Sequence, residues 1–192
     1  MRVLIVFGTT EGHTRAIAQF VARCVRALGH RATVNEAGPD ASHPDVAAYD
    51  VVFLAASLHV GRFQAPLVHY AREQHEALAA RPSAFISVSL ACAGECPDDW
   101  AGLEECLARF RQETRWTPAA THHAAGAILY SQYDFFKRLA LKHIVEKRGQ
   151  KTVTSRDYDL TDYEALRTFV TDFIAENAGR AAPAVAEAST PT

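Results

Sequence analysis

The sequence has no long apolar run, few cysteines and no excess of either charge. Its longest apolar stretches, such as residues 3–7 and 51–56, are far shorter than the about 18 residues that a membrane-spanning helix needs. The 20 Lys and Arg residues nearly balance the 22 Asp and Glu residues, so we do not expect a protein that binds nucleic acid over its whole surface. The apolar run behind Met1 is too short for a secretory signal. These absences favour a cytoplasmic protein without a transmembrane helix.

The four cysteines fit neither a zinc site nor a disulfide framework; they are Cys24, Cys92, Cys96 and Cys106. None of them forms a C-x-x-C pair, and no second pair offers zinc spacing. Cys24 and Cys106 fall in helical patterns, so we expect both to be buried thiols. His122 and His123 have no third ligand at metal spacing and are predicted to be turn residues. We therefore expect no metal site.

Strand-like and helix-like segments alternate along the chain, whose 192 residues suit one domain. Strands are predicted at 2–7, 31–36, 50–56, 83–90 and 124–130, and helices at 14–28, 66–80, 98–114 and 161–177. Thr161 is the expected N-cap of the last helix, with Glu164 three residues on. The alternation predicts an α/β doubly wound, five-stranded parallel sheet over residues 1–178, followed by a tail at 179–192.

The segment between the first strand and the first helix has the composition of a phosphate site. It reads Phe7-Gly8-Thr9-Thr10-Glu11-Gly12-His13-Thr14. Backbone N–H groups at a helix start attract anions, glycine permits a tight turn, and three threonine hydroxyls add donors. A cradle with many hydroxyls and no lysine suits a phosphate monoester, although an ordinary capped turn would use the same residues.

Other occupants of such a fold are disfavoured by what this loop and its neighbours lack. The loop has neither the lysine of a P-loop nor the G-x-G-x-x-G of a dinucleotide site. A response regulator needs an Asp after the third strand, where this chain has Ala55-Ala56-Ser57. A cysteine phosphatase needs a cysteine in the first loop, which has none.

Several stretches together resemble one known family. The loop at 7–14 resembles the FMN-phosphate loop of flavodoxins. The longer match is to the flavodoxin-like, quinone-dependent protoporphyrinogen oxidases of bacterial haem synthesis, over roughly residues 1–176. It rests on Ala55-Ala56-Ser57-Leu58-His59-Val60-Gly61-Arg62-Phe63, Trp116-Thr117-Pro118, Gly126-Ala127-Ile128-Leu129-Tyr130, Tyr133-Asp134-Phe135-Phe136-Lys137-Arg138 and Thr154-Ser155-Arg156-Asp157-Tyr158.

This resemblance implies a non-covalently bound FMN held by three loops. Its binding residues would be Thr9, Thr10, Glu11, Gly12, His13 and Thr14 at the phosphate, with Ser57, Leu58, His59, Val60, Gly61, Leu90, Ala91, Cys92 and Ala93 beside the ring. Neither ring loop contains the Trp and Tyr that sandwich the ring in many electron-carrier flavodoxins, which predicts weaker flavin binding. His59 is a candidate flavin or substrate contact because imidazole titrates near neutrality, and an exposed loop histidine is the alternative. Cys92 is expected to touch the flavin or fill space rather than act as a redox thiol.

The segment at 131–160 is too long for a plain strand-to-helix connection. Between residues 135 and 152 it carries six basic residues and one acidic residue, and its apolar spacing predicts a helix at about 133–148. Three interpretations stay open: a solvated surface helix, contact with anionic lipid head groups, or a clamp for the propionates of a porphyrinogen. The candidate contact residues are Lys137, Arg138, Lys142, Arg148 and Arg156.

The family resemblance implies an FMN-dependent oxidase of protoporphyrinogen IX that passes electrons to a membrane quinone, menaquinone or ubiquinone. Contact with the inner membrane would be peripheral. No oligomeric state is predicted, and no nucleic acid is expected as a partner. The alternatives are a flavodoxin-type electron carrier, an NAD(P)H:quinone reductase, and a relative that has lost its flavin.

Overall fold

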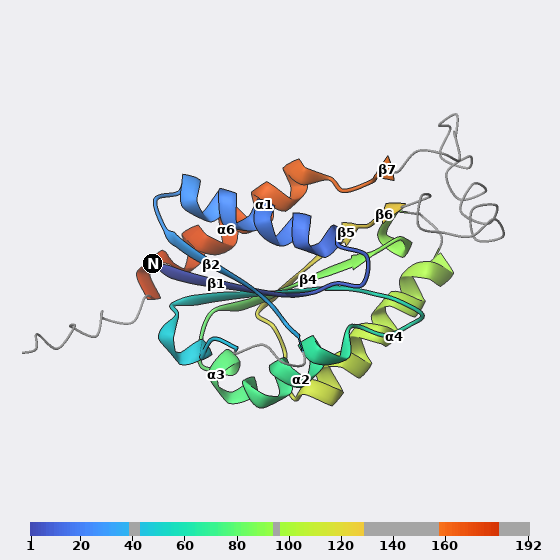
Figure 1. Ribbon diagram of the computed structural model, residues 1–192, viewed down its shortest axis with the longest axis horizontal. Coiled ribbons are helices and arrows are strands. Elements are labelled where there is room, and N and C mark those ends of the chain that lie inside the picture. Colours follow the sequence, from blue (N-terminus) through green and yellow to red (C-terminus); the bar gives the residue numbers. More distant parts are fainter. Residues whose placement is uncertain (39–42, 94–96, 129–157, 181–192) are drawn as a thin grey trace, which may run out of the picture.

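A computed structural model describes residues 1–38, 43–93, 97–128 and 158–180 (Figure 1). Its main sheet has five parallel strands, β1 (Arg2–Gly8), β2 (Arg31–Glu36), β3 (Val51–Ser57), β4 (Ser83–Ser89) and β5 (Ala120–Ala125). Their order is β2-β1-β3-β4-β5. From β1 the chain continues to β2 on one side of β1 and then to β3 on its other side. The topological switch point therefore lies between β1 and β3, and ligands bind at this point in such folds. The predicted doubly wound fold is confirmed.

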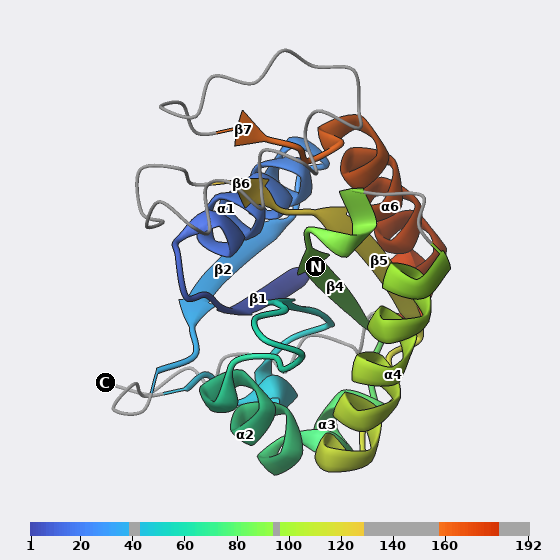
Figure 2. The same cartoon turned by 90° about the vertical axis from the view of Figure 1, so that its right-hand side faces the viewer.

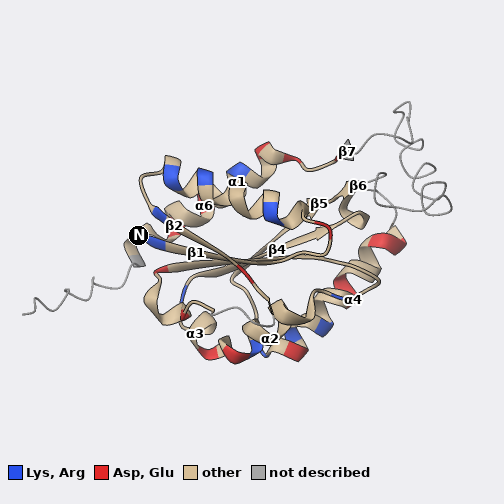
Figure 3. Ribbon diagram, viewed as in Figure 1, with Lys and Arg blue, Asp and Glu red and all other residues tan. Residues whose placement is uncertain are grey.

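Helices cover both faces of the sheet (Figures 1 and 2). Helices α1 (His13–Ala27) and α6 (Tyr163–Asn177) lie on one face, and α2 (Ala65–Glu73), α3 (His75–Ala79) and α4 (Pro97–Thr114) on the other. Strands β1, β3 and β4 are buried on both faces, which explains their nearly continuous apolar sequence. The charged residues of the helices lie mainly on their outward faces (Figure 3).

The end of α1 follows its sequence signal closely. Leu28 is the C-cap, and Gly29 adopts a left-handed φ of 82°. The Gly29 N–H then donates to the Arg26 carbonyl at 2.9 Å and the His30 N–H to the Val25 carbonyl at 3.2 Å. This pair of bonds satisfies the last carbonyls of the helix and ends it at the predicted glycine.

Three local predictions need correction. The helix predicted at 66–80 is interrupted at Gln74, which separates α2 from α3. The N-cap of α6 is Asp162 rather than Thr161, because the Asp162 carboxylate accepts the N–H groups of Glu164 and Ala165. Cys24 is buried as predicted, but Cys106 is only partly buried and its thiol donates to the Gly61 carbonyl at 3.3 Å.

The fifth strand begins four residues earlier than predicted, so His122 and His123 are strand residues and not turn residues. β5 is an edge strand that is mostly half-buried, so its sequence need not be continuously apolar. The His122 ring stacks on Phe169 of α6 at a centroid distance of 5.0 Å. The His123 ring contacts Trp100 of α4 edge-on at 5.6 Å. Burial lowers the pKa of both histidines, so the neutral rings pack as aromatic residues.

Two short strands, one soon after β5 and one just before α6, pair with each other. Strand β6 (Ala127–Ile128) pairs antiparallel with β7 (Tyr158–Asp159). The Leu160 N–H also donates to the Gly126 carbonyl at 3.3 Å. Ile128 and Tyr158, the described residues on either side of 129–157, are therefore strand partners beside the carboxyl end of β5. The helix predicted at 133–148, its candidate contact residues and the tail from 181 lie outside the described residues.

Candidate functional site

A cavity opens where the carboxyl ends of β1, β3, β4 and β5 meet. Its walls come from the loop after β1, the ends of β3 and β4, and the turn after β5. The lining residues are Thr9, Glu11, His13, Thr14, Ser57, Leu58, Val88, Ser89, Leu90, Gly126 and Ala127. The cavity thus lies at the edge of the sheet where the topology predicts a ligand.

The loop after β1 is shaped as an anion cradle. Gly12 precedes α1 with a left-handed φ of 86°, and its N–H donates to the Thr9 hydroxyl at 2.9 Å. A Cβ at Gly12 would meet no atom within 4 Å, so its backbone angle, and not crowding, favours glycine here. The Thr14 Oγ1 atom is buried and has no hydrogen-bond partner among the described residues. A buried hydroxyl without a partner costs about 1–3 kcal/mol, which an anion in the cradle would offset.

Gln64, which the sequence did not single out, joins this loop to the end of β3. Its side-chain amide donates to the Thr10 hydroxyl at 3.1 Å and to the Ser57 hydroxyl at 2.6 Å. Its carbonyl oxygen accepts the Ser57 N–H at 3.1 Å. A Cβ on Gly8 would lie 3.0 Å from the Gln64 Cβ atom. Gly8 is therefore required for the close approach that lets Gln64 hold two walls of the site together.

His13 ties the start of α1 to the turn after β5. Its Nε2 atom lies 2.9 Å from the Thr161 hydroxyl, which itself donates to the Ala125 carbonyl at 2.9 Å. The hydroxyl therefore accepts from His13, which fixes the tautomer with the proton on Nε2. Burial lowers the pKa of His13, and the Asp159 carboxylate 3.6 Å away opposes that shift. A neutral His13 thus serves as a hydrogen-bond donor that positions the cradle.

The segment after β3 is a tight hairpin. Backbone bonds run from the His59 N–H to the Arg62 carbonyl at 2.8 Å and from the Arg62 N–H to the His59 carbonyl at 3.1 Å. Val60 and Gly61 both have positive φ angles, 50° and 72°, as a type I′ turn requires. Val60 is 89% exposed at the tip, and a β-branched residue is strained in this backbone region.

The segment after β4 forms a short 3-10 turn, Ala91–Ala93. The Cys92 sulfur lies 3.1 Å from the Ser89 hydroxyl, and the Cys92 N–H donates to the same oxygen at 3.4 Å. Burial raises the pKa of the Cys92 thiol, and the bond to Ser89 opposes this only in part. Because the thiolate is the reactive form, a protonated Cys92 fits the predicted packing role.

The structure brings many of the predicted residues to one cavity but not all of them. Those that line it are Thr9, Glu11, His13, Thr14, Ser57, Leu58 and Leu90. Thr10 and Gly12 belong to the same loop but are not among the lining residues, and His59, Val60, Ala91, Cys92 and Ala93 lie in the two adjoining turns. Gly61 lines a different groove. Sequence reasoning missed Val88, Ser89, Gly126 and Ala127, which follow from the rule that parallel strands end at one edge.

The described residues contain neither a possible membrane span nor a cluster of metal ligands. No helix there is both long and apolar enough to cross a bilayer. No group of three or more His, Cys, Asp and Glu side chains there is arranged to hold a metal ion.

Comparison with known families identifies the domain. A family model described as a flavodoxin domain matches residues 4–155. The chain belongs to this flavodoxin family. Its switch-point cavity and its cradle between β1 and α1 occupy the part of the fold where the sequence predicted the flavin phosphate.

Curated relatives of the chain share one name, protoporphyrinogen IX dehydrogenase [quinone]. The relative from Leishmania major is 32% identical over 175 residues, which are 91% of this chain and 75% of that protein. The relative from Escherichia coli K12 is 30% identical over 170 residues, 88% of this chain and 92% of that protein. Both alignments extend over most of the domain.

Solved flavodoxins share the fold at low sequence identity. A short-chain flavodoxin associated with a bacterial microcompartment superposes with a TM-score of 0.57 at 10% identity, over 92% of this chain and 99% of its own. Oxidised flavodoxin 1 from Bacillus cereus gives a TM-score of 0.55 at 13% identity, over 91% and 98%. These likenesses confirm the flavodoxin-like fold.

Proposed function

We propose that this protein is an FMN-dependent protoporphyrinogen IX dehydrogenase that passes electrons to a membrane quinone in haem biosynthesis. The observation that carries the proposal is the match to dehydrogenases of that name over about nine-tenths of the chain, combined with a switch-point cavity of flavodoxin type. The protein acts in this view as an oxidoreductase whose substrate is a porphyrinogen.

The residues present fit an FMN phosphate. The buried Thr14 hydroxyl lacks a partner among the described residues, and the N–H groups of the first turn of α1 have no acceptors within the helix. The positive end of the helix dipole adds attraction for an anion. Thr9 and Thr14 would hold the phosphate, while Ser57, Leu58 and Leu90 would lie beside the rest of the cofactor.

When bound, FMN would supply the two-electron redox chemistry, and the protein would supply position and environment. Gln64 and His13 hold the walls of the cavity in fixed relation through the hydrogen bonds described above. Val88, Ser89 and Leu90 line the cavity at the end of β4 and would lie against a bound ligand there. His59 begins the hairpin that follows Ser57 and Leu58. Its contact with the flavin or the substrate remains a prediction.

Spectroscopy of the FMN-loaded protein tests the reaction. Anaerobic mixing with protoporphyrinogen IX is expected to bleach the flavin absorbance near its visible maximum, and subsequent addition of a quinone should restore it. NADPH should bleach it far more slowly. Rapid bleaching by NADPH would instead identify an NAD(P)H:quinone reductase. A flavin that neither porphyrinogen nor NADPH reduces would contradict the proposal and favour an electron carrier.

We further propose that the protein contacts the cytoplasmic face of the membrane peripherally, through the basic segment at 135–152. The β6–β7 ladder supports this, because the described residues that flank this segment, Ile128 and Tyr158, pair with each other next to Ala127, which lines the cavity. Replacing Lys137, Arg138 and Lys142 by Ala should weaken binding to vesicles with anionic lipid about 100-fold, at about 1 kcal/mol per cation. Vesicle sedimentation measures this, with flavin content as the control. Unchanged sedimentation would favour a solvated segment.

A further inference from the structure

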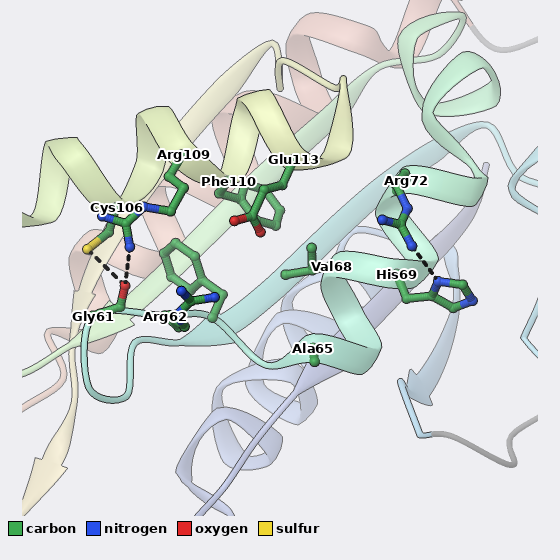
Figure 4. Close-up of a pocket in the computed structure, with 11 residues that line it drawn as sticks. Gly61, Arg62, Ala65, Val68, His69, Arg72, Cys106, Arg109, Phe110 and Glu113 are labelled. Atoms are coloured by element: carbon green, nitrogen blue, oxygen red, sulfur yellow. Dashed lines mark hydrogen bonds between the residues drawn. The ribbon is translucent and has the colours of Figure 1, made fainter.

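A second and larger cavity lies between α2, α4 and the hairpin after β3 (Figure 4). Its volume is about 330 Å³. The floor is aromatic, since Phe63 and Phe110 are buried with ring centroids 5.3 Å apart. Val68 and Cys106 extend this apolar surface from the two helices. The groove could therefore accept the edge of an apolar ring system.

Three arginines surround this apolar floor, one from each wall. Arg62 comes from the hairpin, Arg72 from α2 and Arg109 from α4. Among the described residues no carboxylate lies within salt-bridge distance of any of the three guanidinium groups. One acidic residue, Glu113, is found among the described residues of the lining. The groove thus has an excess of positive charge that its own acids do not neutralise.

Hydrogen bonds to other described residues use only part of the donor capacity of Arg72 and Arg109. Arg109 donates from Nη1 to the Gly61 carbonyl at 3.3 Å, and Arg72 donates from Nη2 to His69 Nδ1 at 3.1 Å. His69 Nε2 lies 3.0 Å from the Glu73 carboxylate, so one neutral tautomer serves both contacts. A guanidinium has five N–H donors in a fork that matches a carboxylate, so Arg72 and Arg109 keep capacity for an anion.

The hairpin after β3 separates this groove from the switch-point cavity. Ser57 and Leu58 line the cavity, whereas Gly61, Arg62 and Phe63 line the groove. The Arg109 and Cys106 bonds to the Gly61 carbonyl fix the hairpin against α4. A ligand in the groove would therefore lie against the same short loop as the cofactor.

We propose that the groove binds the carboxylate-bearing edge of an apolar ring compound, and, resting on the function proposed above, that this edge is the propionate side of the porphyrinogen. Arg72 and Arg109 pair with the carboxylates, and Phe63 and Phe110 contact the ring. This assigns the propionates to described residues of α2 and α4 rather than to the basic segment at 135–152.

Binding of protoporphyrin IX, the stable oxidised compound, to the FMN-loaded protein in mild detergent tests the assignment. The double variant R72A/R109A should bind it about tenfold more weakly, as expected for two exposed charge pairs. Arg72 has no hydrogen bond to the hairpin among the described residues, so the single variant R72A should leave the hairpin in place and reduce the affinity for protoporphyrin IX about threefold. E113Q should bind slightly more tightly. The matched control R23A/R26A removes two exposed arginines from α1 and should bind as the unmodified protein does.

Two further measurements locate the ligand. Protoporphyrin IX should protect Cys106 from alkylation, mapped by peptide mass spectrometry, because Cys106 lines the groove. The dimethyl ester, which lacks the carboxylates, should bind about equally to the unmodified protein and to R72A/R109A. Equal affinity of the two proteins for the free acid, or no protection of Cys106, would overturn the assignment.

These outcomes also separate the groove from the proposed reaction. Oxidation of porphyrinogen with unchanged porphyrin affinity in R72A/R109A would preserve the function and refute the groove. Weakened porphyrin binding in that variant, in a protein that does not oxidise porphyrinogen, would support the groove and refute the function.

Discussion

Thr10→Glu is expected to weaken the proposed binding of FMN by at least about 100-fold. Thr10 is an exposed residue of the loop between β1 and α1, and its hydroxyl accepts a hydrogen bond from the Gln64 side chain. A glutamate there would place a carboxylate beside the phosphate, and repulsion between such charges a few ångströms apart costs on the order of 3 kcal/mol. Fluorescence titration of FMN against the apoprotein measures the change, because bound and free flavin differ in emission.

The control for charge is Thr10→Gln, which has nearly the same size as the glutamate variant and no charge. It should bind FMN within about tenfold of the unmodified protein. Since salt screens the repulsion, 1 M salt should recover part of the affinity of the glutamate variant and change that of the glutamine variant little. Because Thr10 is exposed, the free energy of unfolding of both apoproteins should stay within about 0.5 kcal/mol. Full FMN affinity in Thr10→Glu would place the phosphate elsewhere.

The strands of the central sheet were predictable from sequence because their burial is nearly complete. β1, β3 and β4 are covered on both faces, so each appears as a short apolar run. β5 has the opposite environment: it is an edge strand whose half-buried positions hold His122 and His123. Histidine there packs as a neutral ring, which an apolar pattern does not reveal. The start of β5 was predicted wrongly because β5 is less buried than β1, β3 and β4.

The candidate site divides in the same way between local and tertiary causes. The cradle between β1 and α1 is built from neighbours in sequence, so the sequence could single out its threonines and Gly12, and Thr9 and Thr14 line the cavity. Gln64 carries no local signal, because its role depends on the packing of the start of α2 against Gly8 at the end of β1. The three arginines of the groove are likewise brought together only by the packing of α2, α4 and the hairpin after β3 against one another. Contacts between segments far apart in the chain leave no periodic pattern in the sequence from which they could be predicted.

Trp116→Ala should lower the free energy of unfolding by about 3–5 kcal/mol, more than any other variant described in this Discussion. Trp116 is fully buried between α4 and β4, with its ring at 6.1 Å from that of Phe110 and 6.3 Å from that of Phe85. Its indole N–H donates to the Ser83 hydroxyl at 3.0 Å, which in turn donates to the Leu78 carbonyl at 2.9 Å. Removing the indole leaves a cavity and breaks this chain. Urea unfolding followed by far-ultraviolet circular dichroism measures the loss.

Two further variants separate the parts of that loss. Trp116→Phe keeps an aromatic ring and removes the N–H, so it should cost clearly less, about 1–2 kcal/mol. Trp100→Ala removes a partly buried tryptophan from the same face of the sheet and should also cost less than Trp116→Ala. A domain of this kind is stable by about 5–15 kcal/mol, so Trp116→Ala would remove a large share of its stability. A loss below about 1 kcal/mol would mean that Trp116 does not join α4 to β4. The wall of the groove that carries Arg109 and Phe110 would then depend on the stacking of Phe110 of α4 on Phe85 of β4, whose ring centroids lie 4.6 Å apart.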